Sequence, residues 1–184
     1  MKKVLLLVMG LIVSNLYGQS EKYRPGFYTD LNGDKISGFI YYISGGQIKF
    51  RATNDDKPKK IKPNEVLGFT CDGKEFIVFK NFKIKLQLMV EDVDYRFVRQ
   101  VKKGKVNLYT DDESIHFQGV VSDVVVYLLK RENSETIDYV PFRNKAFRTA
   151  MSTYFADNLE LKNKILGKEL VYEDIERIVD IYNK

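Results

Sequence analysis

Two groups of carboxylates lie close enough in the sequence to suggest acid–base chemistry. Asp92 and Asp94 are two residues apart, and Asp111, Asp112 and Glu113 are consecutive. Glycoside hydrolysis needs two carboxyl groups at a defined separation, one of them with a pKa raised by an apolar pocket. The linear sequence indicates neither condition. We therefore interpret the triplet as a solvated turn and the pair as residues preceding a strand, and we assign no catalytic residue.

The segment 30–34, DLNGD, places oxygen ligands at alternate positions, as the start of an EF-hand-like calcium loop does. The sixth position of such a loop requires glycine and the twelfth an acid, but here they are Lys35 and Tyr41. A tight hairpin turn at Asn32-Gly33 explains the segment better. We therefore expect no metal ion at this segment.

The chain contains one histidine, His116, and one cysteine, Cys71. His116 would need distant partners to form a metal site or a Cys–His pair. Cys71 falls in a predicted strand, and we interpret it as a buried, inert thiol, since free cysteine is among the most buried residue types. There is no GxSxG, HExxH, CxxC or glycine-rich phosphate motif, which argues against the common hydrolases and oxidoreductases. No cofactor is expected.

Four lysines occur within residues 57–62, where they could contact phosphate groups. Asp55 and Asp56 precede them, and no aromatic residue is interleaved to stack on bases. The whole chain has a formal charge of only +5, from 30 basic and 25 acidic residues. We therefore expect no nucleic-acid partner and predict a mobile loop over 54–63.

The chain has twelve Phe, twelve Tyr and no Trp. Tyr41 and Tyr42 are adjacent in a predicted strand, so their side chains point to opposite faces, and one of them faces away from the core unless both faces are covered. An exposed tyrosine row is a plausible contact surface for a sugar, a peptide or a protein. Tyrosine in strands also follows from β-propensity alone. Tyr28, Tyr41 and Tyr42 are the candidate ligand or partner surface.

The elements that must position these residues are β-strands over residues 23–141 and helices over 142–184. Turn signals at Asn32-Gly33, Asp72-Gly73 and Lys103-Gly104 predict hairpins. The predicted strands are 27–31, 36–42, 47–51, 67–71, 75–80, 82–90, 95–101, 105–110, 114–117, 124–129 and 136–140.

After Pro141 the apolar period changes from two to about 3.6. This change predicts helices over 142–154, from near Asn158 and over 172–182, covering one face or one open end of the sheet. The sequence therefore predicts a single α+β domain over 19–184. Its N-terminal part is an antiparallel β-meander of about eight to ten strands, curled or barrel-like, and two or three C-terminal helices follow.

Residues 1–18 have the pattern of a secretory signal peptide: Lys2 and Lys3, ten apolar residues over 4–13, and small or polar residues over 14–18. Ten helical residues cover about half of a roughly 30 Å hydrocarbon core, so we expect no membrane anchor after cleavage. No lipobox cysteine is present near residue 18. The expected location is periplasmic or secreted; the alternative is a buried N-terminal helix.

Three segments carry a resemblance over nearly the whole mature chain: GFYTDLNGDKISGFIYY, IKPNEVLGFTCDGKEF and YFADNLELKNKILGKELVYEDIERIVDIYNK. Together they resemble a group of uncharacterised secreted proteins common in Bacteroidota-type bacteria. The group has a glycine-aromatic start, an NGD turn, and a C-terminal YFxD…L…YN signature. The resemblance implies a Gram-negative envelope location and strands followed by helices, but no activity. Some relatives have cysteine where this chain has Asn158.

These observations favour a non-enzymatic periplasmic or secreted binding module that contacts an envelope protein or a glycan through its sheet face or loops. The alternative is an envelope hydrolase or carbohydrate-active protein whose carboxylates are not recognisable in the linear sequence. A cleft holding two acids about 5–10 Å apart would favour the alternative. A filled barrel with an exposed aromatic patch and no polar cleft would favour the binding module.

Overall fold

The computed structural model describes residues 23–42, 46–86, 89–117 and 120–184. Within 85–90 and 112–124, only the backbone of these residues is described. The predicted signal segment 1–18 lies outside these residues. In chain order the strands are β1 (Arg24–Asp30), β2 (Lys35–Tyr42), β3 (Ile48–Arg51), β4 (Lys59–Ile61), β5 (Val66–Cys71), β6 (Lys74–Leu86), β7 (Met89–Lys102), β8 (Val106–Phe117), β9 (Val120–Arg131) and β10 (Asp138–Tyr139).

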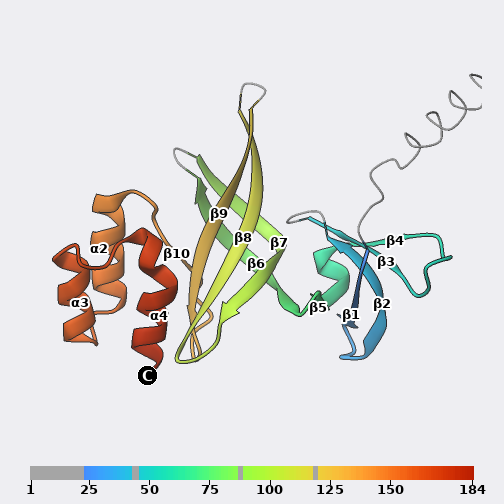
Figure 1. Cartoon of the computed structure of the whole chain (residues 1–184), viewed down its shortest axis with the longest axis horizontal. Helices are drawn as coiled ribbons and strands as arrows, with labels where there is room; N and C mark the ends of the chain where they lie inside the picture. Colours follow the sequence, from blue (N-terminus) through green and yellow to red (C-terminus); the bar gives the residue numbers. More distant parts are fainter. Residues whose placement is uncertain (1–22, 43–45, 87–88, 118–119) are drawn as a thin grey trace, which may run out of the picture.

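The strands form one curled antiparallel sheet in the order β10-β9-β8-β7-β6-β5-β1-β2-β3-β4 (Figure 1). β1 lies between β2 and β5, so the sheet consists of two meanders, β1 to β4 and β5 to β10, joined by the pairing of β1 with β5. Three helices follow: α2 (Asn144–Tyr154), α3 (Leu159–Leu166) and α4 (Ile175–Asn183). The α+β class, with a curled antiparallel sheet before C-terminal helices, is confirmed.

Local turn chemistry explains the hairpins. Asp72 and Gly73, between β5 and β6, have φ angles of 52° and 71°, which fit a turn with two left-handed residues. Between β1 and β2, Gly33 has a φ of 92°. The Asp30 carboxylate there accepts hydrogen bonds from the backbone N–H groups of Asn32 and Asp34, each at 2.9 Å. The hairpin interpretation of segment 30–34 is therefore confirmed.

The predicted strand over 82–90 and the predicted loop over 54–63 are wrong. Residues 82–90 do not form one strand, because the chain reverses between β6 and β7, where Leu86 pairs with Met89. Residues 54–63 are not entirely a loop, because they contain β4. β4 is an edge strand that pairs with β3 alone and buries Ile61, so the two prolines that flank it interrupt no central ladder.

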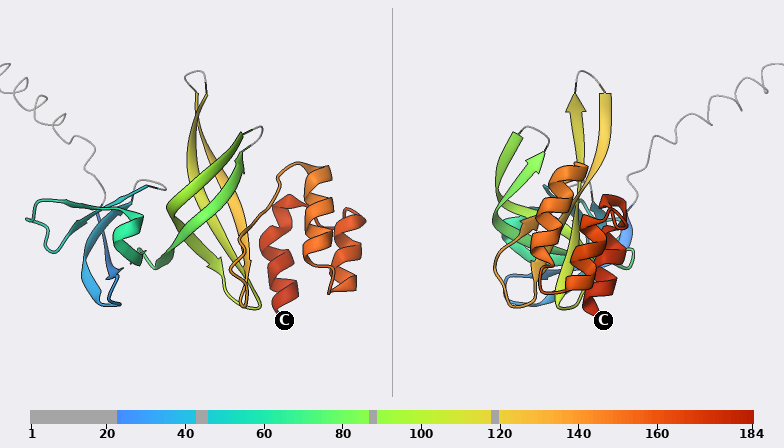
Figure 2. Two further views of the ribbon diagram at one scale, coloured as in Figure 1. Left: turned by 180° about the vertical axis from the view of Figure 1, so that it is seen from behind. Right: turned by 90° about the vertical axis from the view of Figure 1, so that its left-hand side faces the viewer.

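The helices occupy one end of the elongated molecule and β1 to β4 the other (Figures 1 and 2). As predicted, the second helix begins after Asn158, whose side chain accepts a hydrogen bond from Leu161 N at 3.0 Å. The helices cover one end of the sheet, packing around Val106, Leu108 and Leu129 of β8 and β9. Two further cores lie in the sheet itself, one under β1 to β5 around Ile40, Phe69 and Phe97, and one between β6 and β9 around Phe79, Phe82, Tyr109 and Leu128.

Paired glycines make the tight curl of β1 and β2 possible. Gly26 and Gly38 lie opposite each other across the two strands. A Cβ atom at Gly38 would lie 2.3 Å from the Arg51 carbonyl oxygen and 2.6 Å from the Phe50 ring, and one at Gly26 would lie 2.1 Å from the Thr70 carbonyl oxygen. No side chain fits at these separations. The glycines therefore allow β1 to lie close to the backbone of β5, and β2 to lie close to β3 and the Phe50 ring.

Candidate functional site

The structure does not bring the three predicted tyrosines together. Tyr28 and Tyr42 face the core under β1 to β5, where their ring centroids lie 4.9 Å from Phe50 and 4.7 Å from Phe76, respectively. Tyr41 points to the opposite side of the sheet, as the alternation along β2 requires. Of the three predicted contact residues, only Tyr41 therefore lies on the side of the sheet that faces away from this core.

We call the side of the sheet on which Tyr41 lies the outer face. Strand alternation and cross-strand pairing place cations beside aromatic rings there. Phe39 of β2 pairs with Arg51 of β3, and Tyr41 pairs with Lys49, which in turn pairs with Lys60 of β4. Directly paired residues point to the same side of a sheet. The outer face consists of Tyr23, Phe27, Lys35, Phe39, Tyr41, Lys49, Arg51 and Lys60.

Three cation–aromatic contacts organise this surface. Lys35 Nζ lies 4.8 Å from the centroid of the Phe27 ring, and Lys49 Nζ lies 5.6 Å from that of Tyr41. The Arg51 guanidinium carbon lies 4.2 Å from the Tyr23 ring centroid. Such contacts contribute about 0.5–1 kcal/mol each at exposed sites. They restrict three flexible cationic side chains to defined positions on the sheet.

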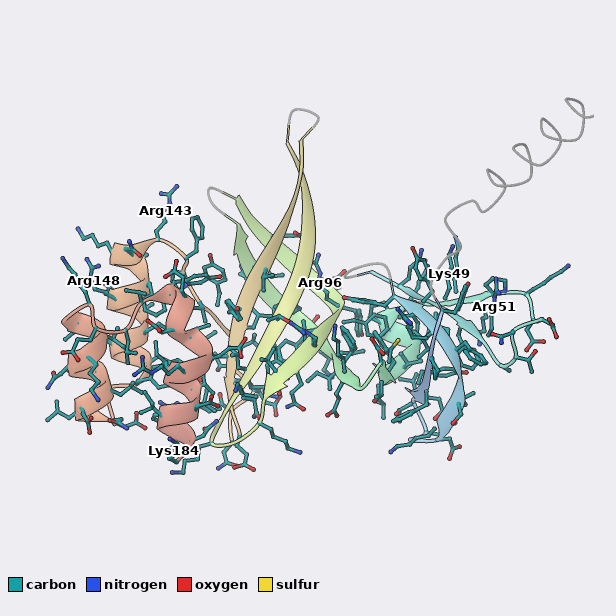
Figure 3. All side chains as sticks on the ribbon, viewed as in Figure 1. Lys49, Arg51, Arg96, Arg143, Arg148 and Lys184 are labelled. Atoms are coloured by element: carbon teal, nitrogen blue, oxygen red, sulfur yellow. The ribbon has the colours of Figure 1, made fainter. Side chains whose placement is uncertain are left out.

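The placement of Lys60 adds positive charge to the same surface. It lies directly opposite Lys49, and like charges at paired positions destabilise a sheet. Lysine on an edge strand also blocks pairing with another chain. Figure 3 shows Lys49 and Arg51 at the end of the molecule farthest from Arg143 and Arg148 of the helical end. The outer face is therefore a cationic surface separate from the basic residues of α2.

A shallow pocket of about 230 Å³ continues the outer face across β1, β5 and β6. Lys35, Phe27 and Thr29 line one side, and the other side includes Thr70 and Glu75. The pocket is smaller than the roughly 300–1,000 Å³ typical of sites for drug-sized ligands. It therefore matches a subsite for one small ring rather than a cavity that encloses a substrate.

Two other shallow pockets have different linings. One of about 260 Å³ lies at Arg131 and Glu132, after β9, and one of about 250 Å³ lies beside Cys71, Asp72 and Tyr42. Each of the three pockets is lined by a single carboxylate, which is Glu75, Glu132 or Asp72. None of these three pockets therefore holds the acid pair that glycoside hydrolysis requires.

Cys71 is buried, as predicted, with its Sγ 3.8 Å from the Ile40 carbonyl oxygen. Burial is the main cause that raises the pKa of the Cys71 thiol, and the neighbouring charge of Asp72 raises it further. A raised pKa keeps the sulfur in the protonated, weakly nucleophilic form at neutral pH. This agrees with the interpretation of Cys71 as an inert thiol.

The predicted turn at residues 111–113 is wrong, because β8 runs through all three residues. Asp111 is fully buried and accepts a hydrogen bond from Arg96 at 2.9 Å, and Arg96 also binds Glu91 at 3.0 Å. Arg96 balances the buried charge, so the acid does not require a solvated turn. The side chains of Asp112, Glu113 and His116, also in β8, lie outside the described residues.

The pair Asp92 and Asp94 lies within β7 and not before a strand, which corrects the sequence interpretation. Both residues are exposed, and Asp92 forms an ion pair with Lys83 of β6 at 3.3 Å.

Among the side chains that the structure describes, no group of three or more His, Cys, Asp or Glu residues is placed to hold a metal ion. No helix within the described part of the chain is long and apolar enough to cross a membrane.

One cluster was not predicted from the sequence. The Arg131 guanidinium donates hydrogen bonds to the Tyr182 hydroxyl at 2.5 Å, to the Tyr154 carbonyl at 2.6 Å and to the Asp157 carboxylate at 3.3 and 3.4 Å. Tyr182 also donates to Asp157. Asn183 binds both backbone groups of Val106 at 2.9 Å. The YFxD and YN segments quoted above were the available signal, and their polar groups attach the helices to β8 and β9.

The cluster at Arg131 is engaged within the fold, whereas the outer face presents rings and cations on the surface of the sheet. The outer face can bind anionic groups through N–H donors and can contact flat apolar surfaces through its rings.

A scan against protein-family models found no matching family, and searches of the curated proteins and of the solved structures found no match.

Proposed function

We propose that this chain is a non-enzymatic binding module of the periplasm or the secreted fraction, and that the outer face of β1 to β4 contacts its envelope partner. The observation that carries the proposal is the set of three cation–aromatic contacts, made by Lys35, Lys49 and Arg51 on one sheet face. Aromatic residues and arginine are the types enriched where proteins bind partners.

Two of the acids considered for acid–base chemistry are engaged by cations. Asp111 is occupied by Arg96, and Asp92 lies against Lys83 on an exposed strand surface. A general acid with a raised pKa needs an apolar pocket and a second carboxyl group beside it. Both acids therefore have structural or surface roles in this proposal.

The proposed location rests on the sequence. The lysine-plus-apolar pattern of residues 1–18 is typical of an export signal. The resemblance to secreted proteins of Bacteroidota-type bacteria supports the same compartment. A partner in the Gram-negative envelope follows from this proposed location.

Co-sedimentation of the purified chain with an envelope fraction of the source bacterium tests the proposal. The variant Lys49→Gln/Arg51→Gln removes two positive charges from the outer face. As the matched control, Arg143→Gln/Arg148→Gln removes two from the helical end, one just before α2 and one within it. We expect the first variant to reduce the bound fraction about fivefold and the control to leave it unchanged. Equal binding of both variants, with folding verified by circular dichroism, would contradict the proposal.

A further inference from the structure

We infer that the ligand of the outer face is a glycan that carries anionic groups such as uronate, sulfate or phosphate. This inference rests on the proposed function and names the ligand class of the same surface. Four features support it: the arrangement of the cations, the position of a cation over each aromatic ring, the short edge strand β4, and the lining of the pocket beside Phe27.

The cations form a regular array. Lys49 and Lys60 are directly paired on neighbouring strands, and Arg51 lies two residues along β3 from Lys49. Paired residues are about 4.5–5.5 Å apart, and alternate residues of a strand are about 6.8 Å apart. A chain with repeated anionic groups can contact several of these cations at once. Charge complementarity therefore favours a polyanion over a neutral partner.

The rings favour a sugar over single-stranded nucleic acid. Proteins that bind single strands stack successive bases on open aromatic faces. Here a cation lies over each of the Phe27, Tyr41 and Tyr23 rings, so a stacking base would have to displace it. An anionic sugar can instead accept hydrogen bonds from the cation while its apolar C–H groups contact the edge of the same half-buried ring.

The edge of the sheet disfavours an acidic peptide that binds as an added strand. β4 has only three residues, and Pro58 and Pro63 lie on either side of it. Proline cannot donate to a ladder, and a short edge rich in lysine resists strand addition. The open edge therefore gives an extended peptide few backbone hydrogen bonds.

The pocket beside Phe27 adds polar groups that suit a sugar. Its lining includes the hydroxyl groups of Thr29 and Thr70 and the carboxylate of Glu75, next to the cation of Lys35. A carboxylate repels a purely anionic polymer but accepts hydrogen bonds from neutral sugar hydroxyls. Hydroxyls and anionic groups on one ligand would therefore satisfy both Glu75 and Lys35.

Binding of defined probes to the full chain tests the inference. The saccharide probes are oligogalacturonate, heparin oligosaccharides and a neutral dextran oligosaccharide of equal length. The other polyanions are polyglutamate, oligo-dT and phosphatidylglycerol vesicles. We expect at least one anionic saccharide to bind about tenfold more tightly than the neutral one, with weaker binding at higher salt. The Lys49→Gln/Arg51→Gln variant should lose about fivefold in affinity for it, whereas Arg143→Gln/Arg148→Gln should not.

The variant Glu75→Gln separates a glycan from a general polyanion. It should weaken saccharide binding, because sugar hydroxyls lose a charged acceptor, and should strengthen binding of polyglutamate or oligo-dT, because a repulsion is removed. Tighter saccharide binding by Glu75→Gln overturns the inference, as does equal or tighter binding of another polyanion. If the envelope assay responds to the outer-face variant but no anionic saccharide binds, the glycan inference fails and the proposed function stands. If that assay does not respond, the proposed function itself fails.

Discussion

At the end of α4, the amide side chain of Asn183 bonds to the backbone of β8, and its contribution to stability can be predicted. Asn183 Oδ1 accepts a hydrogen bond from Val106 N, and Asn183 Nδ2 donates one to Val106 O, both at 2.9 Å. Gly104 provides the space, because a Cβ atom there would lie 2.6 Å from both Cγ and Nδ2 of Asn183. We therefore predict that Gly104→Ala and Asn183→Ala break the same two hydrogen bonds.

The magnitude follows from the burial of Val106, which has no exposed surface. A buried backbone group left without a partner costs about 1–3 kcal/mol, so loss of both bonds by Asn183→Ala should lower the free energy of unfolding by about 2–6 kcal/mol. Gly104 does not have a positive φ, so alanine meets no backbone strain there, and its cost comes from displacing the Asn183 amide. Gly104→Ala should therefore cost a similar amount.

Urea unfolding of the four proteins in this double-mutant cycle, followed by far-ultraviolet circular dichroism, measures the coupling. The double variant should be about as stable as either single variant, which gives a coupling of about 2 kcal/mol or more. Gly46→Ala is the control, since a Cβ atom there meets nothing within 4 Å, and it should change stability by less than about 0.5 kcal/mol. Additive costs at positions 104 and 183 would refute the shared mechanism.

Two further predictions concern the helical end. The pKa of Asp157 lies below its ordinary value of 3.8, first because Tyr182 donates a hydrogen bond to the carboxylate and then because Arg131 does. A lowered folded-state pKa stabilises the fold above the unfolded value, and this stabilisation is lost as the pH falls through the folded value. Asp157→Asn should thus be less stable than wild type at pH 7, with a difference in urea midpoint that shrinks below about pH 4; a constant difference would contradict this. Lys168 follows α3 with a φ of 66°, so Lys168→Gly should raise the unfolding free energy by about 1 kcal/mol in thermal or urea unfolding. The control Lys162→Gly, inside α3, should lower it by about as much. No gain at position 168 would show that its backbone is not strained.

The parts of the fold that could be predicted from the sequence are those fixed by residues close together in the chain. The turn at Asp72-Gly73 was predictable because its left-handed conformations follow from the residue types themselves. The position of β1 between β2 and β5 was not, because it depends on pairing between distant segments. The same applies to Asp111, whose charge is balanced by Arg96 fifteen residues earlier in the chain. When the partner cannot be identified from the sequence, three consecutive acids resemble a solvent-exposed turn.

The candidate site was predictable only in part. Alternation correctly separated Tyr41 from Tyr42, but which of them faced outward depended on where the core formed. The alternation of apolar and basic residues in β3 indicates the outer face. Ile48 and Phe50 are buried, so Lys49 and Arg51 must lie on the opposite side of the strand. The cation–aromatic contacts additionally require β2 and β3 to pair in the observed register.

The two ends of the molecule use their polar residues in opposite ways. At the helical end, Asp157 and Tyr182 form hydrogen bonds within the fold, so their polar groups stabilise the packing of the helices. At the other end, the pairing of Lys49 with Lys60 opposes stability, because it places like charges on adjacent strands. Lysine on the edge strand β4 also resists pairing with another chain, so the same residue that repels Lys49 protects the edge of the sheet. The proposed binding surface is the outer face, whereas Asp157 and Tyr182 contribute to the scaffold.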